Sequence, residues 1–264
     1  MCGIAGYSAS PESELARTLA AQTLLAGIAE RGADAVGYAY RVPGATHAVV
    51  VKQRTAASEL LDRVSVPRDT ADLLVHVRDY TKGHPSIAAN NHPIRHGRVV
   101  GIHNGIIVND DELLAVHSCA RAEPRMTVDS EAIFALAAHS GNDPRALEDL
   151  HGSMAAAWLD EREPGQVFLA RGVGRPLWIG QGREGIFFAS TKLALEVVEH
   201  YCRVKLQKRQ LGQGTLLTLN AGEIVARQRF RPNTFVEDSN LPAVRAPQER
   251  EFCLTRLASI AAAA

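Results

Sequence analysis

The residue with the clearest chemical potential is Cys2, which directly follows Met1 and precedes Gly3. Methionine aminopeptidases remove Met1 when the second side chain is small, which would leave Cys2 with a free α-amine. A free amine has a pKa of about 7.7 to 8.0, so near neutral pH it can accept a proton from the adjacent thiol. Nucleophile and base would then lie on one residue, although a cysteine at position two can also be a coincidence.

Five further segments follow MCGIAG at 1–6. They are RGADAVG at 31–37, HVR at 76–78, NNHP at 90–93, HNGIIVN at 103–109 and VDSE at 128–131. Their order and spacing resemble the class II glutamine amidotransferases, which include the glutaminase domains of glucosamine-6-phosphate synthase, glutamine phosphoribosylpyrophosphate amidotransferase, asparagine synthetase and glutamate synthase. The resemblance extends to about residue 220, and so many ordered motifs seldom arise by chance.

The resemblance implies that Cys2 attacks the side-chain amide of L-glutamine. Attack on an amide carbon creates a tetrahedral oxyanion that needs fixed hydrogen-bond donors. By resemblance, the side-chain amide of Asn104 and the backbone N–H of Gly105 form this oxyanion hole, and a glycine lets the backbone approach the substrate closely. The alternative for Asn104-Gly105 is an ordinary hairpin turn after a strand at 99–102.

Free glutamine carries an α-carboxylate and an α-ammonium, so its recognition requires one cation and one anion near the nucleophile. Arg78 can hold the carboxylate in a bidentate grip, and Asp129 can pair with the ammonium. Thr81 resembles a family residue that hydrogen-bonds the carboxylate. The alternative for Asp129 is a simple N-cap of a helix at 131–138.

Three residues are expected to support the site. Asn90 and His92 resemble the family's Asn-x-His-Pro turn, which forms a pocket wall, and Arg31 is expected to support the segment beside Cys2. One loop departs from the family: Asp79 and Lys82 stand where the aminosugar synthase branch usually has tryptophan and histidine. This loop normally closes over bound glutamine, and the two changes leave its behaviour in this chain open.

Short β-rich runs recur along the chain, several of them apolar on both sides, and helical segments lie between them. The runs are 4–7, 36–40, 48–52, 73–77, 99–102, 155–159, 167–170, 185–188 and 215–219, with helices expected from about 12 to 31 and at 130–138, 144–150 and 193–199. The pattern predicts a layered sandwich. The resemblance implies an α+β fold, a four-layer αββα sandwich of two antiparallel sheets of the N-terminal-nucleophile hydrolase type.

The chain is predicted to divide into an amidotransferase domain at 2–230 and a C-terminal tail at 231–264. Prolines and polar residues weaken the pattern after residue 231, and a short helix is expected near the end. The tail is interpreted as a docking arm or a partly disordered segment.

Composition limits the partners of this 264-residue chain. Its 29 basic and 29 acidic residues cancel, which argues against nucleic acid and anionic membranes. The sequence has no long apolar run and no signal-peptide layout, so a cytoplasmic location is expected. The four cysteines are far apart, and neither a metal nor another cofactor is expected.

The function predicted is a glutaminase that releases glutamate and ammonia through a Cys2 thioester. Because the chain ends too early for a synthase domain, the ammonia is expected to pass to a separate synthase subunit. Two alternatives stay open: a stand-alone hydrolase of another γ-glutamyl or small amide, and a catalytically silent regulatory module on the same scaffold.

Overall fold

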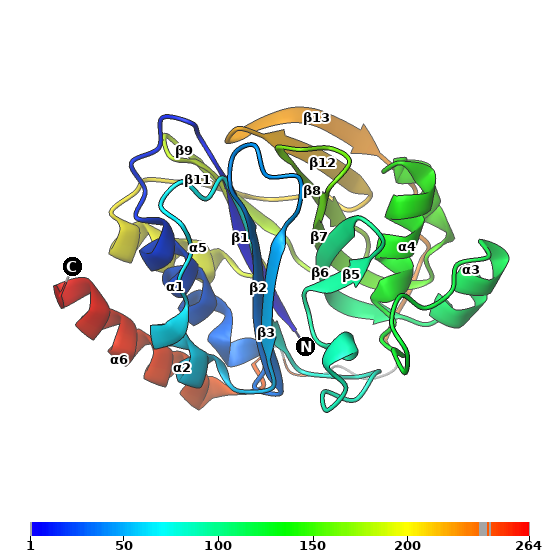
Figure 1. Cartoon of the computed structure of the whole chain (residues 1–264), viewed down its shortest axis with the longest axis horizontal. Coiled ribbons are helices and arrows are strands. Elements are labelled where there is room, and N and C mark those ends of the chain that lie inside the picture. Colours follow the sequence, from blue (N-terminus) through cyan, green and yellow to red (C-terminus); the bar gives the residue numbers. More distant parts are fainter. Residues whose placement is uncertain (1, 238–241, 243, 264) are drawn as a thin grey trace.

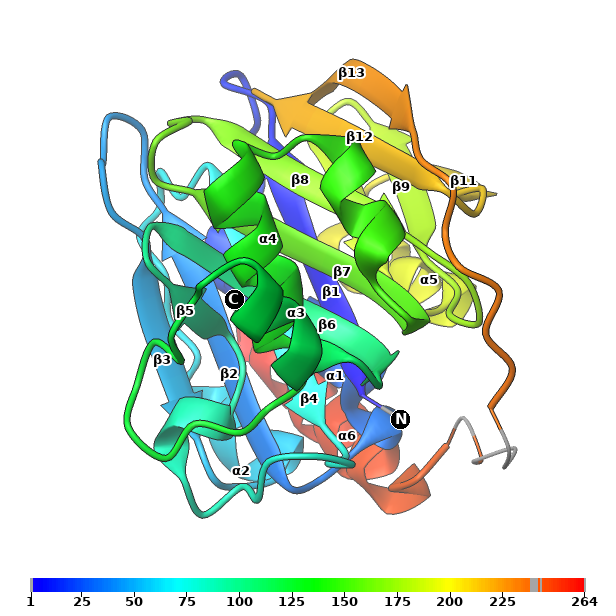
Figure 2. The same cartoon turned by 90° about the vertical axis from the view of Figure 1, so that its right-hand side faces the viewer.

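The fold consists of two antiparallel sheets that lie face to face, with helices on both outer faces (Figures 1 and 2). The structure is a computed structural model that describes residues 2–237, 242 and 244–263. The first sheet has the order β11-β9-β10-β1-β4-β2-β3, with β1 Gly3–Ala9, β2 Ala35–Arg41, β3 Val49–Gln53, β4 Asp72–Arg78, β9 Trp178–Gly182, β10 Gly185–Ala189 and β11 Gln207–Gln210. The second has the order β13-β12-β8-β7-β6-β5, with β5 Ile94–His96, β6 Val99–Ile107, β7 Gly152–Asp160, β8 Gln166–Arg171, β12 Thr215–Asn220 and β13 Glu223–Arg229. The predicted αββα sandwich is confirmed.

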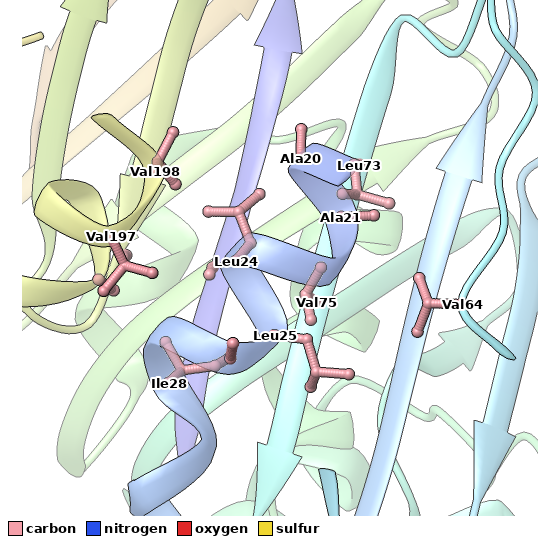
Figure 3. Packing of buried hydrophobic residues seen from close by; sticks show 14 of the residues in the cluster. Ala20, Ala21, Leu24, Leu25, Ile28, Val64, Leu73, Val75, Val197 and Val198 are labelled. Carbon is pink, nitrogen blue, oxygen red and sulfur yellow. The ribbon is translucent and has the colours of Figure 1, made fainter. Parts of the chain in front are cut away.

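Helices of two groups complete the layers. The first sheet is covered by α1 (Arg17–Ile28), α2 (Ala57–Leu60), α5 (Lys192–Cys202) and α6 (Pro247–Ala263), and the second by α3 (Asp110–Val116) and α4 (Glu131–Ser140). Four 3₁₀ turns lie at Ala29–Arg31, Leu61–Arg63, Ala88–Asn90 and Pro144–Asp149. Figure 3 shows Leu24, Leu25 and Ile28 of α1 over the first sheet, with Val197 and Val198 of α5 beside the helix. Apolar burial on this face holds the helical layer to the sheet.

The residues of β7 explain why this strand lies in the interior of its sheet, with both faces buried. Met154, Ala156 and Trp158 belong to the hydrophobic cluster under α4, whereas Ala155 and Ala157 belong to the cluster between the two sheets. Successive side chains of a strand point to opposite faces. Because both faces are covered, an apolar residue is required at nearly every position of the strand.

The layer between the sheets is apolar in the middle and polar at both ends. Leu74 of β4 lies in this layer beside Ile102 of β6. By the same alternation, Asp72, His76 and Arg78 of β4 face the other sheet. Polar residues such as Asp72 and Arg78 therefore lie on the same face of β4 as the core residue Leu74, but at the ends of the strand.

Several expectations about local structure are wrong. The helix predicted to start after Ser10 and Pro11 begins at Arg17, because Ser10 and Ser13 instead form turn hydrogen bonds with the backbone of Glu12 and Leu15. The segment 144–150 is a 3₁₀ turn rather than an α-helix.

The C-terminal segment packs on the domain itself. Residues 231–237 follow the end of the second sheet, where Asn233 Nδ2 donates to the carbonyls of Glu148 and Leu150. Helix α6 then contributes Cys253 and Leu257 to the core under α1. The predicted tail includes residues 238–241, 243 and 264, which lie outside the described residues, and the division at residue 230 stays a prediction. Within the described ranges, no helix combines the length and apolar character needed to cross a membrane.

Candidate active site

One small cavity brings together the residues singled out for glutamine recognition. Its lining comprises Cys2, Arg78, Asp79, Tyr80, Thr81, Lys82, His92, His103, Gly105, Val128, Asp129 and Ser130. These residues come from both sheets, the loop after β4 and the start of α4. The cavity volume is about 10 Å³, which is roughly the space for one water molecule. Glutamine therefore cannot enter unless a wall of the cavity moves.

Cys2 lies at the entrance to β1, with its side chain against the loop that follows β4. The thiol contacts the carbonyl oxygen of Asp79 at 3.4 Å, and the Arg31 Nε donates to the Cys2 carbonyl at 3.2 Å. Burial raises the pKa of the Cys2 thiol, and the contact with Asp79 opposes this. The resting group is thus a neutral thiol, which needs a base before it can attack.

Ser190 fixes the strand that carries Cys2, and sequence reasoning gave it no role. Its hydroxyl accepts a hydrogen bond from the Ile4 N–H at 2.9 Å and lies 3.2 Å from the Ile4 carbonyl. Ser190 is fully buried. The only signal for it is that Ser190 lies within the part of the chain, up to about residue 220, over which the family resemblance extends.

Asn104 lies within strand β6, paired with Ala155 of β7, so the hairpin-turn alternative is wrong. It is fully buried, and neither its side-chain oxygen nor its side-chain nitrogen has a hydrogen-bond partner among the described residues. An unpaired buried amide costs about 1–3 kcal/mol. Such a group fits a donor held ready for a ligand.

Gly105 follows Asn104 at a place where only glycine fits. Its φ is +151°, and a Cβ there would lie 1.9 Å from the carbonyl oxygen of Ser153 on β7. Any larger side chain would have to push the two strands apart. The absence of a side chain also leaves its backbone open to the cavity that Cys2 lines.

Asp129 is buried one residue before the N-cap position of α4. Its Oδ2 accepts a hydrogen bond from the Ile107 N–H at 2.8 Å, and the N-cap residue Ser130 makes no side-chain cap. The interpretation of Asp129 as a simple N-cap is therefore wrong. Burial raises the pKa of Asp129 to about 6, with the Ile107 hydrogen bond opposing the shift. A cationic partner would stabilise the charged form of such a buried carboxylate.

Arg78 is almost fully buried at the end of β4, and its guanidinium is already occupied. It donates to Asn91 Oδ1 at 2.6 Å, to the Lys82 carbonyl at 3.0 Å, and also to the Gly83 carbonyl. To grip a substrate carboxylate, Arg78 must exchange some of these bonds. The partner Asn91 was missed, because its side chain is brought to Arg78 only by the fold.

Residues 79–85, here called the lid loop, form the wall nearest solvent. The loop carries Thr81, which lines the cavity. Asn90 connects the end of the loop to the segment before Asp129: its Nδ2 donates to the His84 carbonyl at 3.3 Å, and its Oδ1 accepts from the N–H groups of Thr127 and Val128. Asn90 thus lies where a wall-supporting residue is expected.

Two histidines, His92 and His103, line the cavity, and a third, His76, contacts both of them. His76 and His92 stack with ring centroids 4.1 Å apart, and His76 Nε2 lies 3.1 Å from the His103 carbonyl. His103 Nδ1 lies 2.9 Å from the hydroxyl of Ser130, another partner that the sequence did not indicate. Burial lowers the pKa of His76 and of His103 to about 3, and that of His92 well below its usual value. All three rings are therefore neutral and poor proton acceptors.

The described part of the chain contains no group of three or more His, Cys, Asp or Glu residues placed to hold a metal ion. The cavity lining instead groups a thiol, a guanidinium and a carboxylate, and the unpaired amide of Asn104, which is not itself in the lining, lies next to the lining residue Gly105 in β6. These groups suit attack on an amide of a zwitterionic substrate.

Comparison with known proteins agrees with this arrangement. Residues 80–197 match a family model described as a glutamine amidotransferase domain. The chain is 31% identical over 246 residues to glutamine–fructose-6-phosphate aminotransferase (isomerizing) of Symbiobacterium thermophilum, which covers 88% of the chain and 39% of that protein. It is 30% identical over 213 residues to the Haemophilus ducreyi enzyme of the same name, covering 76% and 33%. The chain thus spans between about a third and two fifths of the length of these relatives.

Solved structures share the fold. Glutamine phosphoribosylpyrophosphate amidotransferase from B. subtilis superposes with a TM-score of 0.67 at 19% identity, covering 86% of this chain and 49% of that one. A glutamine aminotransferase class-II domain protein from Silicibacter pomeroyi gives a TM-score of 0.56 at 18% identity, covering 88% of this chain and all of that one.

The two facing antiparallel sheets between helical layers place the chain in the N-terminal-nucleophile hydrolase class of folds. Within that class, the family match over residues 80–197 and the curated relatives support a class II glutamine amidotransferase domain in this chain.

Proposed function

We propose that this chain hydrolyses L-glutamine to glutamate and ammonia through a thioester on Cys2, with the ammonia passed to a separate synthase partner. The observation that carries the proposal is the meeting of Cys2, Gly105, Arg78 and Asp129 on one cavity. The unpaired buried amide of Asn104, next to Gly105 in β6, supports it.

In the acylation step, the Cys2 thiol gives its proton to its own α-amine, freed by removal of Met1, as Sγ bonds to the amide carbon of glutamine. The carbonyl electron pair moves to oxygen, and the oxyanion accepts hydrogen bonds from the Asn104 side chain and the Gly105 N–H. Collapse breaks the C–N bond, and the proton passes to the leaving nitrogen. Ammonia departs and a γ-glutamyl thioester remains.

In the deacylation step, water gives a proton to the same amine and attacks the thioester carbon. The C–S bond breaks, Sγ regains a proton, and glutamate leaves. The α-amine is favoured as the base because a useful base has a pKa near the working pH. The low pKa values of His76, His92 and His103 make the nearby rings unsuitable.

Arg78 and Asp129 supply the specificity in this proposal. The guanidinium binds the α-carboxylate with Thr81, and the Asp129 carboxylate pairs with the α-ammonium. Arg31 and Asn90 hold the segments beside Cys2 and Asp129, and His92 fills the wall behind the cavity. An amide lacking either charged group would lose one of these pairings.

The test compares protein whose N-terminus has been established as Cys2 by intact mass with a Cys2→Ala variant. Equal amounts of glutamate and ammonia should be released by the wild type, and the variant should lose at least about 10³-fold in rate. Cys119→Ala, which removes a thiol outside the cavity, is the matched control and should keep full activity. Release by Cys2→Ala at the wild-type rate would exclude the thioester.

Two further measurements separate the alternatives. A γ-electrophilic glutamine analogue should add its mass to the peptide containing Cys2, which a silent module would not allow. Comparison of kcat/KM for glutamine and other γ-glutamyl amides then tests whether glutamine is the preferred substrate. The synthase partner is tested by co-purification from native extract, where recovery of this chain alone would count against a stable complex.

A further inference from the structure

The two lid-loop residues that depart from the family, Asp79 and Lys82, both form ion pairs with residues outside the loop. Asp79 pairs with Arg245 near the C-terminus, and Lys82 pairs with Asp110 and Asp111 at the start of α3. The partners Arg245, Asp110 and Asp111 lie outside the sequence motifs that carry the family resemblance. They bear on how the lid loop is held over Cys2.

The lid loop is closed in this structure. The cavity beneath it has a volume of about 10 Å³, and the Asp79 carbonyl contacts the Cys2 thiol at 3.4 Å. A substrate can therefore reach Cys2 only when the loop moves. Whatever holds the ends of the loop controls that movement.

The first anchor is Lys82. Its Nζ lies 2.7 and 2.8 Å from the two carboxylate oxygens of Asp110 and 2.9 Å from Asp111. Asp110 is buried, and Arg121 binds both aspartates, at 2.8 and 2.5 Å, and Glu131 of α4 at 3.1 Å. Lys82 thus connects the lid loop to a network of charged side chains that includes residues of α3 and α4, the helices that cover the second sheet.

The second anchor comes from the C-terminal segment. The Arg245 Nε lies 3.1 Å from the Asp79 carboxylate. The backbone of Arg245 is fixed in turn, because its N–H and that of Ala246 both donate to the Glu30 carbonyl at 2.9 Å. Arg245 lies two residues before α6, which packs against α1 and contributes Cys253 and Leu257 to the core there. This anchor therefore connects the lid loop to the opposite helical layer.

We propose that these two ion-pair anchors clamp the lid loop over Cys2, and that Arg245 of the C-terminal segment is a positioning residue for the reaction. The proposal rests on the proposed function of the same cavity. The two anchors pull on opposite ends of the segment 79–82 and join it to both outer layers of the sandwich. Because the pairs are partly exposed, salt weakens them.

The test measures access to Cys2 without substrate. The rate of iodoacetamide alkylation is followed by mass spectrometry of the Cys2 peptide at low and high salt. Arg245→Ala and Lys82→Met should each raise the rate roughly two- to fivefold at low salt, in keeping with partly exposed pairs. High salt should accelerate the wild type most, and each single variant less, because only one salt-sensitive anchor remains in it.

Arg250→Ala is the matched control. Arg250 lies in the same segment, and its guanidinium pairs with the Glu30 carboxylate at 3.2 Å. It should alkylate at the wild-type rate. Asp79→Asn removes the Arg245 pair from the other side with little change in shape, so a folding failure of Arg245→Ala leaves the test intact.

Kinetics with glutamine distinguish the proposed clamp from the proposed glutaminase activity. A loosened lid should change KM and kcat together, whereas a purely structural role would lower only the amount of folded enzyme. Equal alkylation rates in Arg245→Ala, Asp79→Asn and Arg250→Ala would overturn the clamp even if glutamine is hydrolysed. Faster alkylation without any glutamine hydrolysis would support the clamp and refute the glutaminase.

Discussion

The two ends of the layer between the sheets differ in whether their buried polar groups have hydrogen-bond partners. At one end, Arg41 of β2 donates to the Asp72 carboxylate at 2.8 and 3.1 Å. It also donates to the carbonyls of Asp160 and Gln166 on the other sheet and of Glu163 in the turn between β7 and β8. At the end near Cys2, the buried Asn104 amide has no partner in the described part of the molecule.

The difference separates a structural network from a site prepared for a ligand. A buried ion pair that is fully hydrogen-bonded holds the two sheets together and has no capacity left for a substrate. An unpaired buried amide lowers stability but can bind a charge that appears only during the reaction. We therefore expect mutations at the two ends to have opposite effects on stability and activity.

The largest expected effect is at the structural end. Arg41→Ala leaves the buried Asp72 carboxylate without its cation and should cost about 3–5 kcal/mol in the free energy of unfolding. Burial already raises the pKa of Asp72 and Arg41 opposes this, so the deficit should shrink from pH 8 to pH 5 as Asp72 becomes protonated. Urea denaturation at both pH values measures it, with the exposed Arg209→Ala as control. A loss of kcat per folded molecule would contradict the division of roles.

At the catalytic end, Asn104→Ala should lower kcat about 10²–10³-fold without loss of stability, because the amide it removes is unpaired. The matched control is Asn142→Ala. The Asn142 side chain is fully paired, with Asp160 at 2.8 Å and the Trp158 indole at 2.9 Å. The control should lose stability and keep kcat. Parallel losses in both variants would remove the contrast.

Asp129→Asn tests the proposed ammonium site. The pKa of Asp129, about 6, is raised above its value near 3.9 in an unfolded chain. Its contribution to stability is therefore greatest below pH 4 and falls as pH rises to 6, by about 3 kcal/mol over the two pKa units. The variant should lose this slope, be more stable at pH 7, and have a much lower kcat/KM. In the wild type, kcat/KM should decline below pH 6, and a flat profile from pH 5 to 8 would contradict the assignment.

The smallest expected effect is at Ser190. Ser190→Ala leaves the Ile4 N–H without its hydroxyl partner and should cost about 1–2 kcal/mol, with less than a tenfold fall in kcat. Ser140→Ala, whose hydroxyl has no partner in the described structure, should cost almost nothing. Thermal unfolding of both variants, side by side, makes the comparison. An equal cost would mean that the bond to Ile4 does not stabilise the strand that carries Cys2.

The central strands could be predicted from the sequence because both of their faces are buried. The run at 155–159 is apolar throughout and became β7, whereas β5 (Ile94–His96), β9 (Trp178–Gly182), β11 (Gln207–Gln210) and β13 (Glu223–Arg229) were missed. Three of the missed strands, β5, β11 and β13, lie at sheet edges, where polar and charged side chains prevent unwanted pairing and remove the apolar signal. The fourth, β9, lies inside the first sheet, and Gly180 and Gly182 weaken its strand signal.

The sequence alone predicted the chemical groups of the proposed site, because Cys2, Asn104, Gly105, Arg78 and Asp129 lie in short motifs whose residue types suit the chemistry of an amide. Tertiary structure alone decided their partners: that Arg78 already binds Asn91, that Asn104 is unpaired, and that Asp79 reaches Arg245. A motif records local residue order, whereas burial and hydrogen bonding depend on which distant segments meet. For this reason the sequence predicted what could react, and the fold determined which groups are held ready and which are already bound.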